Sequence, residues 1–162
     1  MTDPVPLLRL LEGDWRLTMS VWSEDGQLTR SDGLRARKRL IADGRYLREE
    51  IEGAFAGGPH EKLTVLGYNA TRGRFEYVTA DNHDAVLLLY LSAAGVRADA
   101  TSVELWAEYA APREGDGADF VLIRTEIISE GADRHVLRNH YRPGGGPERP
   151  FLEYVYARDS VR

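Results

Sequence analysis

Lys38, Glu49 and His140 are the side chains of this sequence best suited to acid–base chemistry. A lysine and a glutamate that face each other can share a proton, and histidine titrates near neutral pH. The chain contains no cysteine, which excludes thiol catalysis, disulfide bridges and cysteine-ligated metal sites. It also lacks an HExxH motif, a nucleophile elbow, a phosphate-binding loop and a dinucleotide fingerprint. We therefore expect neither a metal nor another cofactor.

Length and composition are typical of one globular domain. The chain has 162 residues, 43% of them hydrophobic and 29% charged, and its net charge of -5 argues against nucleic-acid binding. The N-terminus lacks the basic start and apolar run of a signal peptide, and no window is apolar enough for a membrane span. We expect a single cytoplasmic domain over residues 1–162 that does not span a membrane.

Short runs rich in β-forming residues recur between Gly, Asp, Asn and Pro residues. A short helical segment over about residues 4–12 precedes them, and no later stretch keeps the 3.6-residue period of a helix. We expect ten strands, over about residues 14–23, 28–41, 45–54, 61–68, 74–81, 85–92, 98–110, 119–130, 134–142 and 150–158. So many strands joined by short turns predict an antiparallel meander closed into a barrel, with the helical segment as a plug.

Two Asp-Gly pairs, Asp25-Gly26 and Asp43-Gly44, predict the register of the first three strands. They suit two-residue type I′ turns, in which both residues need a positive φ. Counting outward from the second turn places Lys38 opposite Glu49 on the mostly apolar face. Because buried charges are costly unless paired, two roles stay open for Lys38 and Glu49. They form either a structural ion pair near a barrel end or a polar anchor or acid–base pair in a cavity.

The first of these turns predicts which side chains the second strand turns inward. Counting from Asp25-Gly26 pairs Trp15 with Ala36 and Leu17 with Leu34. The same count places Asp32 on the inner face, in the part of the second strand that is nearer to the turn.

A turn around residues 69–73 is expected to join the fourth and fifth strands. This turn would place Leu63 and Val65 on the same face as Tyr77 and Asp81. Tyrosine suits a cavity wall, because its ring is apolar and its hydroxyl forms hydrogen bonds.

A two-residue turn at Gly131-Ala132 is expected to join the eighth and ninth strands. It would pair Thr125 with Arg138 and Ile123 with His140, so the side chains of Arg138 and His140 would point inward. Three roles stay open for His140: a core histidine, a general base, or an axial haem ligand.

The segment Leu11-Glu-Gly13-Asp-Trp15 resembles the Gly-x-Trp start of lipocalin and calycin barrels. In those barrels the Trp fills the closed end and an Arg of the last strand packs on it, which implies these structural roles for Trp15 and Arg158. A closer similarity is to a bacterial domain-of-unknown-function family with a calycin-like barrel. The matching residues are Leu11–Trp15, Gly33, Leu66–Asn69 and Tyr156–Arg158. Related barrels bind fatty acids, retinoids or haem, and a few catalyse rearrangements.

The sequence thus predicts an all-β protein, a single antiparallel barrel of about ten strands with a ligand-sized cavity. We expect it to bind a small, largely apolar molecule. The residues expected to contact this molecule are Lys38, Glu49, Tyr77, Asp81, Tyr109, Arg138, His140 and Tyr154.

Three alternative functions stay open. The first is an isomerase-like or cyclase-like enzyme, in which Lys38 with Glu49, or His140, moves a proton. The second is a haem protein that uses His140. The third is an interaction barrel that forms a homodimer through the face of Leu87, Leu89 and Leu91.

Overall fold

The computed structural model describes residues 5–83, 86–112, 118–144 and 146–159. One short helix precedes ten strands, so the expected all-β fold is confirmed. The elements are α1 (Pro6–Leu11), β1 (Gly13–Trp22), β2 (Leu28–Ile41), β3 (Tyr46–Phe55), β4 (Gly58–Asn69), β5 (Arg74–Asp81), β6 (Leu88–Ser92), β7 (Ser102–Pro112), β8 (Ala118–Ser129), β9 (Arg134–Pro143) and β10 (Arg149–Arg158). In the described part of the chain, no helix is long and apolar enough to cross a membrane.

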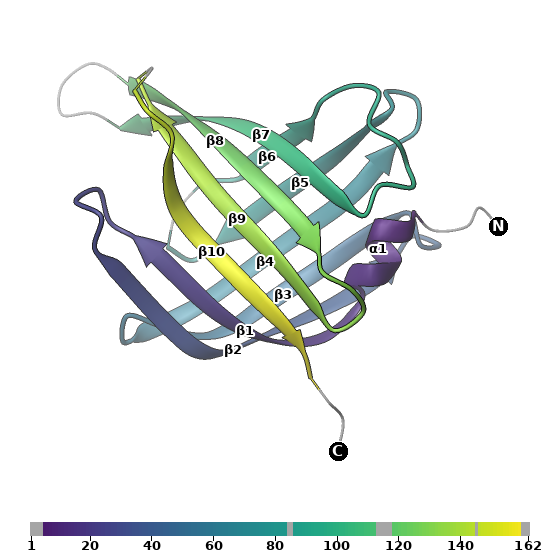
Figure 1. Ribbon diagram of the computed structural model, residues 1–162, viewed down its shortest axis with the longest axis horizontal. Helices are drawn as coiled ribbons and strands as arrows, with labels where there is room; N and C mark the ends of the chain where they lie inside the picture. Colours follow the sequence, from purple (N-terminus) through teal and green to yellow (C-terminus); the bar gives the residue numbers. More distant parts are fainter. Residues whose placement is uncertain (1–4, 84–85, 113–117, 145, 160–162) are drawn as a thin grey trace.

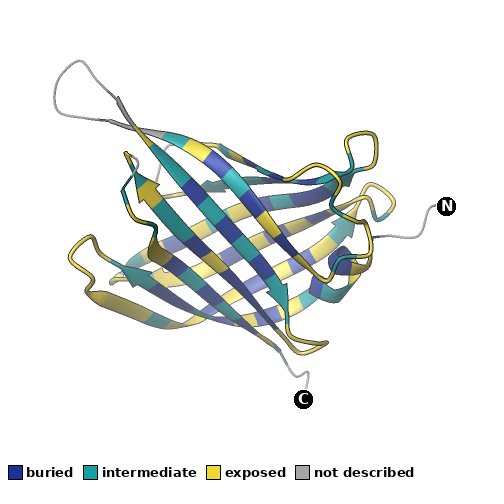
Figure 2. Ribbon diagram, turned by 45° about the horizontal axis from the view of Figure 1, so that its top comes forward, coloured by how far each residue is buried: buried dark blue, intermediate teal, exposed yellow. Residues whose placement is uncertain are grey.

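Each strand pairs with the next, and β10 pairs with β1, so the sheet closes into the expected barrel (Figure 1). Every consecutive pair is antiparallel, as a meander with short connections requires. Buried and exposed residues alternate along the strands, as the colours of Figure 2 show. This alternation follows from the two-residue period of a β-strand, which turns every second side chain into the barrel.

The helix α1 lies across one end of the barrel (Figure 1). Leu7, Leu8 and Leu11 are almost completely buried, and the helix packs against β2, β3 and β8. Since β8 is nearly opposite β2 in the strand order, α1 spans the opening. A helix of six residues is marginal by itself, so this packing is what stabilises it.

Trp15 and Arg158 join α1 to the strands at the same end. Nε1 of Trp15 donates to the carbonyl of Leu11 at 2.9 Å, and the Arg158 guanidinium lies 4.2 Å from the centre of the Trp15 ring. The guanidinium also donates to the carbonyls of Glu12 at 3.1 Å and Ala132 at 2.7 Å. Arg158 therefore connects the last strand to the end of the helix and to the β8–β9 turn.

Gly13 is required for this arrangement. Its φ is +139°, and a Cβ at this position would lie 2.3 Å from an Nη atom of Arg158. Any larger residue would displace the guanidinium from the Trp15 ring.

The predicted register between β2 and β3 is confirmed. Lys38 lies opposite Glu49, and the amide of Arg45 donates to the carbonyl of Ala42 at 3.3 Å, which leaves Asp43-Gly44 as the two-residue turn.

The β1–β2 hairpin has a longer turn than predicted. The amide of Ser23 donates to the carbonyl of Gln27 at 2.9 Å, so three residues form the loop. A bulge at Gly33, with φ of +90°, then restores the predicted pairing of Leu17 with Leu34. The prediction for Asp32 is wrong: Asp32 lies on the outer face, where it accepts a hydrogen bond from the hydroxyl of Thr18 at 2.7 Å.

The predicted register between β8 and β9 is wrong by one residue. The amide of Glu130 donates to the carbonyl of Arg134 at 2.9 Å, so the loop has three residues and not two. Thr125 therefore pairs with Asn139, and a shift of one residue turns every side chain to the other face. Arg138 and His140 consequently point away from the interior of the barrel.

The prediction that Leu63 and Val65 share a face with Tyr77 and Asp81 is also wrong. Asn69 pairs with Arg74, because the side chain and the carbonyl of Asn69 both accept hydrogen bonds from the amide of Arg72. Lys62 therefore lies opposite Asp81 on the inner face, whereas Leu63 is 44% exposed on the outer face.

We predict that Arg158→Met lowers the free energy of unfolding by about 3 kcal/mol, because it removes charge-assisted bonds to backbone carbonyls and the contact with Trp15. Urea denaturation followed by tryptophan fluorescence measures the change. Arg35→Met is the control, because Arg35 makes one exposed ion pair with Asp159, for which we expect about 0–1 kcal/mol. Equal effects of the two substitutions would contradict the role assigned to Arg158.

Candidate functional site

A cavity of about 620 Å³ occupies the end of the barrel opposite α1. Its wall is formed by the end of β1, β3, β5, β7 and β9 and by the start of β4, β6, β8 and β10. Most of the lining is apolar or aromatic and includes Met19, Val21, Phe55, Leu88, Val121, Ile123, Phe151 and Leu152. A smaller polar set includes His60, Lys62, Thr79, Asp81 and Asn139, together with Tyr90, Tyr109, Tyr141 and Tyr154.

His60 and Tyr154 form the best-defined polar contact in this cavity. Nε2 of His60 lies 3.0 Å from the hydroxyl of Tyr154, and both side chains are buried. Burial, together with the nearby His83 and Lys62, lowers the pKa of His60 to about 4, so the ring is neutral at neutral pH. Burial also raises the pKa of Tyr154 well above its usual value, so the hydroxyl keeps its proton.

His83 lies beside His60 on the solvent side. The two rings stack with their centres 5.0 Å apart, and the His83 ring also contacts the edge of Phe55. The amide of His83 donates to Oδ1 of Asp81 at 3.0 Å. His83 is exposed, so this group lies where the cavity reaches the surface.

The opposite wall carries neutral hydrogen-bonding groups. Oγ1 of Thr125 donates to Oδ1 of Asn139 at 2.8 Å, next to Tyr90. Burial raises the pKa of Tyr90 to about 12, partly offset by hydrogen bonds with Thr79 and Thr125. These groups are uncharged at neutral pH and suit hydroxyl or carbonyl groups of a ligand.

Lys38 and Glu49 are inside the barrel but do not line the cavity. They form an ion pair of 3.0 Å that is almost inaccessible to solvent. Nζ of Lys38 also lies 2.9 Å from Nε2 of His135 and 3.9 Å from the centre of the Tyr156 ring, and Thr64 donates to Glu49 at 3.0 Å. The geometry assigns Lys38 and Glu49 to a buried polar cluster between the cavity and the α1 end.

The protonation of this buried cluster follows from its burial. Burial lowers the pKa of Lys38, and the negative charge of Glu49 opposes that change. Burial and the neighbouring Lys38 lower the pKa of His135, so its ring is neutral. Because an ammonium only donates, Nε2 of His135 accepts, and the ring proton is on Nδ1.

Arg138 and His140 do not line the cavity. Nε of Arg138 donates to Glu153 at 2.7 Å on the outer face. Nδ1 of His140 lies 3.2 Å from the Arg124 guanidinium and 3.7 Å from a carboxylate oxygen of Glu126. Neither a proton-transfer role in the cavity nor haem ligation inside the barrel fits this position of His140.

The other predicted contact residues lie inside the barrel. Asp81, Tyr109 and Tyr154 line the cavity, whereas Tyr77 is buried outside its lining and packs on Tyr90 with ring centres 5.6 Å apart. Leu87 and Leu89 are exposed on the outer face, and dimerisation through that face stays a prediction.

Sequence reasoning missed His60, Lys62 and Asn139. A signal for the first two was present, since His60 and Lys62 alternate in phase with Thr64 and Leu66 along one strand. Leu63 and Val65 form an equally regular alternation on the other face of the same strand. Both faces of this strand bury some apolar surface, so the sequence did not show which face points into the barrel.

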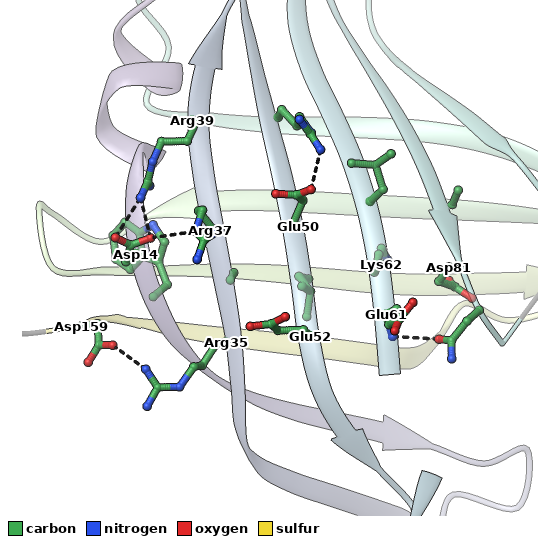
Figure 3. A pocket seen from close by; sticks show the side chains of 17 residues that line it. Asp14, Arg35, Arg37, Arg39, Glu50, Glu52, Glu61, Lys62, Asp81 and Asp159 are labelled. Atoms are coloured by element: carbon green, nitrogen blue, oxygen red, sulfur yellow. Dashed lines mark hydrogen bonds and ion pairs between the residues drawn. The ribbon is translucent and has the colours of Figure 1, made fainter. Parts of the chain in front are cut away.

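A second hollow, of about 1060 Å³, lies on the outer face of β1–β5 (Figure 3). The arginines that line it are paired with carboxylates: Arg39 with Asp14 at 2.8 Å, Arg35 with Asp159 at 3.1 Å, and Arg48 with Glu50. Lys62 and Asp81 contribute to the walls of both hollows. Because these arginines are already paired with carboxylates of the protein, the inner cavity is the better candidate site. Within the described ranges, no group of three His, Asp or Glu side chains is arranged to hold a metal ion.

Comparison with known proteins identifies a family. The profile of a family described as a protein of unknown function (DUF1579) matches residues 3–158, nearly the whole chain. The chain belongs to this family. A search of curated proteins found no match.

We predict that Glu49→Gln lowers the free energy of unfolding by about 3–5 kcal/mol, because it leaves the Lys38 ammonium buried without a countercharge. The double variant Lys38→Met/Glu49→Gln should lose less stability than the sum of the losses in the single variants Lys38→Met and Glu49→Gln. Urea denaturation of the four proteins in this double-mutant cycle gives the coupling. Additive effects would show that the ion pair is not a unit.

We also predict that the protein becomes less stable as the pH falls from about 6.5 to about 4. His60 has an ordinary pKa of 6.5 when unfolded and about 4 when folded, so protons bind the unfolded state preferentially in this window. The loss should be smaller in His60→Phe. Histidine NMR signals followed against pH test the pKa directly, and a His60 signal that titrates near 6.5 would contradict the assignment.

Proposed function

We propose that this DUF1579-family barrel binds a small, largely apolar molecule in the cavity opposite α1. The observation that carries the proposal is the cavity itself: about 620 Å³, mostly aromatic and aliphatic, with a few polar groups. Pockets that hold small molecules commonly have this size and this mixture of surfaces. The apolar wall would supply most of the affinity and the polar groups would orient the ligand.

The opposite end of the barrel supports this proposal. The contact between Trp15 and Arg158, with α1 packed beside it, closes that end. It is also the arrangement that the resemblance to calycin barrels implies, and we propose that the fold is of the calycin type. A ligand would therefore enter from the end where His83 is exposed.

An enzyme in the same cavity is a second candidate, favoured by the contact between His60 and Tyr154. A neutral imidazole that contacts a protonated phenol can relay a proton to a bound substrate. An isomerase-like or cyclase-like reaction would use this pair. Neither Lys38 with Glu49 nor His140 reaches the cavity.

The neighbouring residues Leu88 and Leu89 provide a matched test of binding. Leu88 lines the cavity, whereas Leu89 is 54% exposed on the outer face. We predict that Leu88→Trp, which fills the cavity, weakens binding of the neutral fluorophore 1-aminoanthracene by about tenfold or more, because bulk inside the cavity excludes the probe. Leu89→Trp adds the same bulk outside and should bind like the wild type.

Fluorescence titration measures both affinities, and thermal denaturation shows whether each variant is folded. The absence of saturable binding to the wild-type protein would contradict the proposal. Equal affinity of the wild type and a folded Leu88→Trp variant would place the probe elsewhere and would also contradict it.

A further inference from the structure

We infer that Lys62 binds a carboxylate group of the ligand, so that the natural ligand is an amphipathic monocarboxylate with an apolar body. This inference rests on the proposed function and adds the chemical class of the ligand. It is carried by the different surroundings of the two lysines inside the barrel.

The chain contains only two lysines, Lys38 and Lys62, and both side chains lie on the inner face of the barrel. Lys38 is almost completely buried and its charge is matched by Glu49 at 3.0 Å. Lys62 lies further toward the cavity and is only partly buried. The two ammonium groups thus share the interior but differ in access to solvent and in partners.

The ammonium of Lys62 is directed toward an aromatic ring. Asp81 is its cross-strand neighbour, yet Nζ of Lys62 lies 5.3 Å from the centre of the Tyr154 ring. No carboxylate in the described part of the chain lies within ion-pair distance of this ammonium. An aromatic face compensates only part of the cost of removing an ammonium from water.

Burial lowers the pKa of Lys62, and the negative charges of Asp81 and Glu49 oppose that change from a distance. A carboxylate placed on Nζ would supply both the missing countercharge and a hydrogen-bond acceptor. Charge-assisted hydrogen bonds of this kind are about twice as strong as neutral ones. A ligand carboxylate would therefore gain more at Lys62 than a hydroxyl group would.

The surroundings of Lys62 favour a ligand with a single negative charge over one with two. Asp81 also lines the cavity, so a second negative charge, as on a phosphate dianion, would be repelled. Nδ1 of His60 is buried and has no hydrogen-bond partner among the described residues. This atom is a further polar group at the same wall, and the apolar body of the ligand would lie toward Met19, Leu88 and Ile123.

Two probes with the same apolar body test the inference: 1-pyrenebutyric acid carries a carboxylate, and 1-pyrenebutanol carries a hydroxyl. We predict that the wild type binds the acid about tenfold more tightly than the alcohol, as expected for a hydrogen bond between two charged groups. Lys62→Met should remove this preference by weakening the acid alone. Lys62→Arg should keep it, because it keeps the positive charge.

Arg48→Met is the control, because Arg48 is a cation of the adjacent β3 on the outer face and should not change either affinity. Fluorescence titration near pH 7.5 gives the affinities, and Lys62→Gln replaces Lys62→Met if the latter does not fold. If neither probe binds the wild type, the proposed function fails. If both probes bind the wild type equally, or if loss of Lys62 weakens both alike, the cavity binds ligands but the carboxylate inference is overturned.

Discussion

Pairing between β1 and β10 closes the sheet, and the position of every inward side chain depends on it. Closure satisfies the backbone of both edge strands and fixes ten registers at once. Trp15 lies directly opposite Arg158 in this pairing, and the guanidinium reaches from there to the end of α1. The same few contacts therefore hold the pairing of β1 with β10 and the helix α1 that covers this end of the barrel.

Closure also divides the interior into two parts with different physical character. Near α1, large buried side chains and the cluster around Lys38 and Glu49 occupy the interior. Toward the other end, the inward side chains do not meet across the barrel. They line a cavity of about 620 Å³ instead. A ten-stranded barrel is wider than the eight-stranded kind that side chains just fill, so one end can be packed and the other can be hollow.

The distribution of charge follows this division. Arginines cover the outer face, where they pair with Asp and Glu in water and contribute little to stability. The two lysines lie inside, one in a complete ion pair and the other at the cavity wall. Lys62 is partly buried and has no ion pair among the described residues, and this is the reason for the proposal that it meets a carboxylate of the ligand.

The sequence by itself determined the strands, the closed all-β architecture and the pairing of Lys38 with Glu49, because alternation and an Asp-Gly turn are local signals. It did not determine which way Lys62, Arg138 and His140 point. A loop longer or shorter by one residue differs little in local free energy, yet it reverses every side chain of a strand. Only closure of the whole barrel, which must bury one consistent set of side chains, decided between these registers and so formed the cavity.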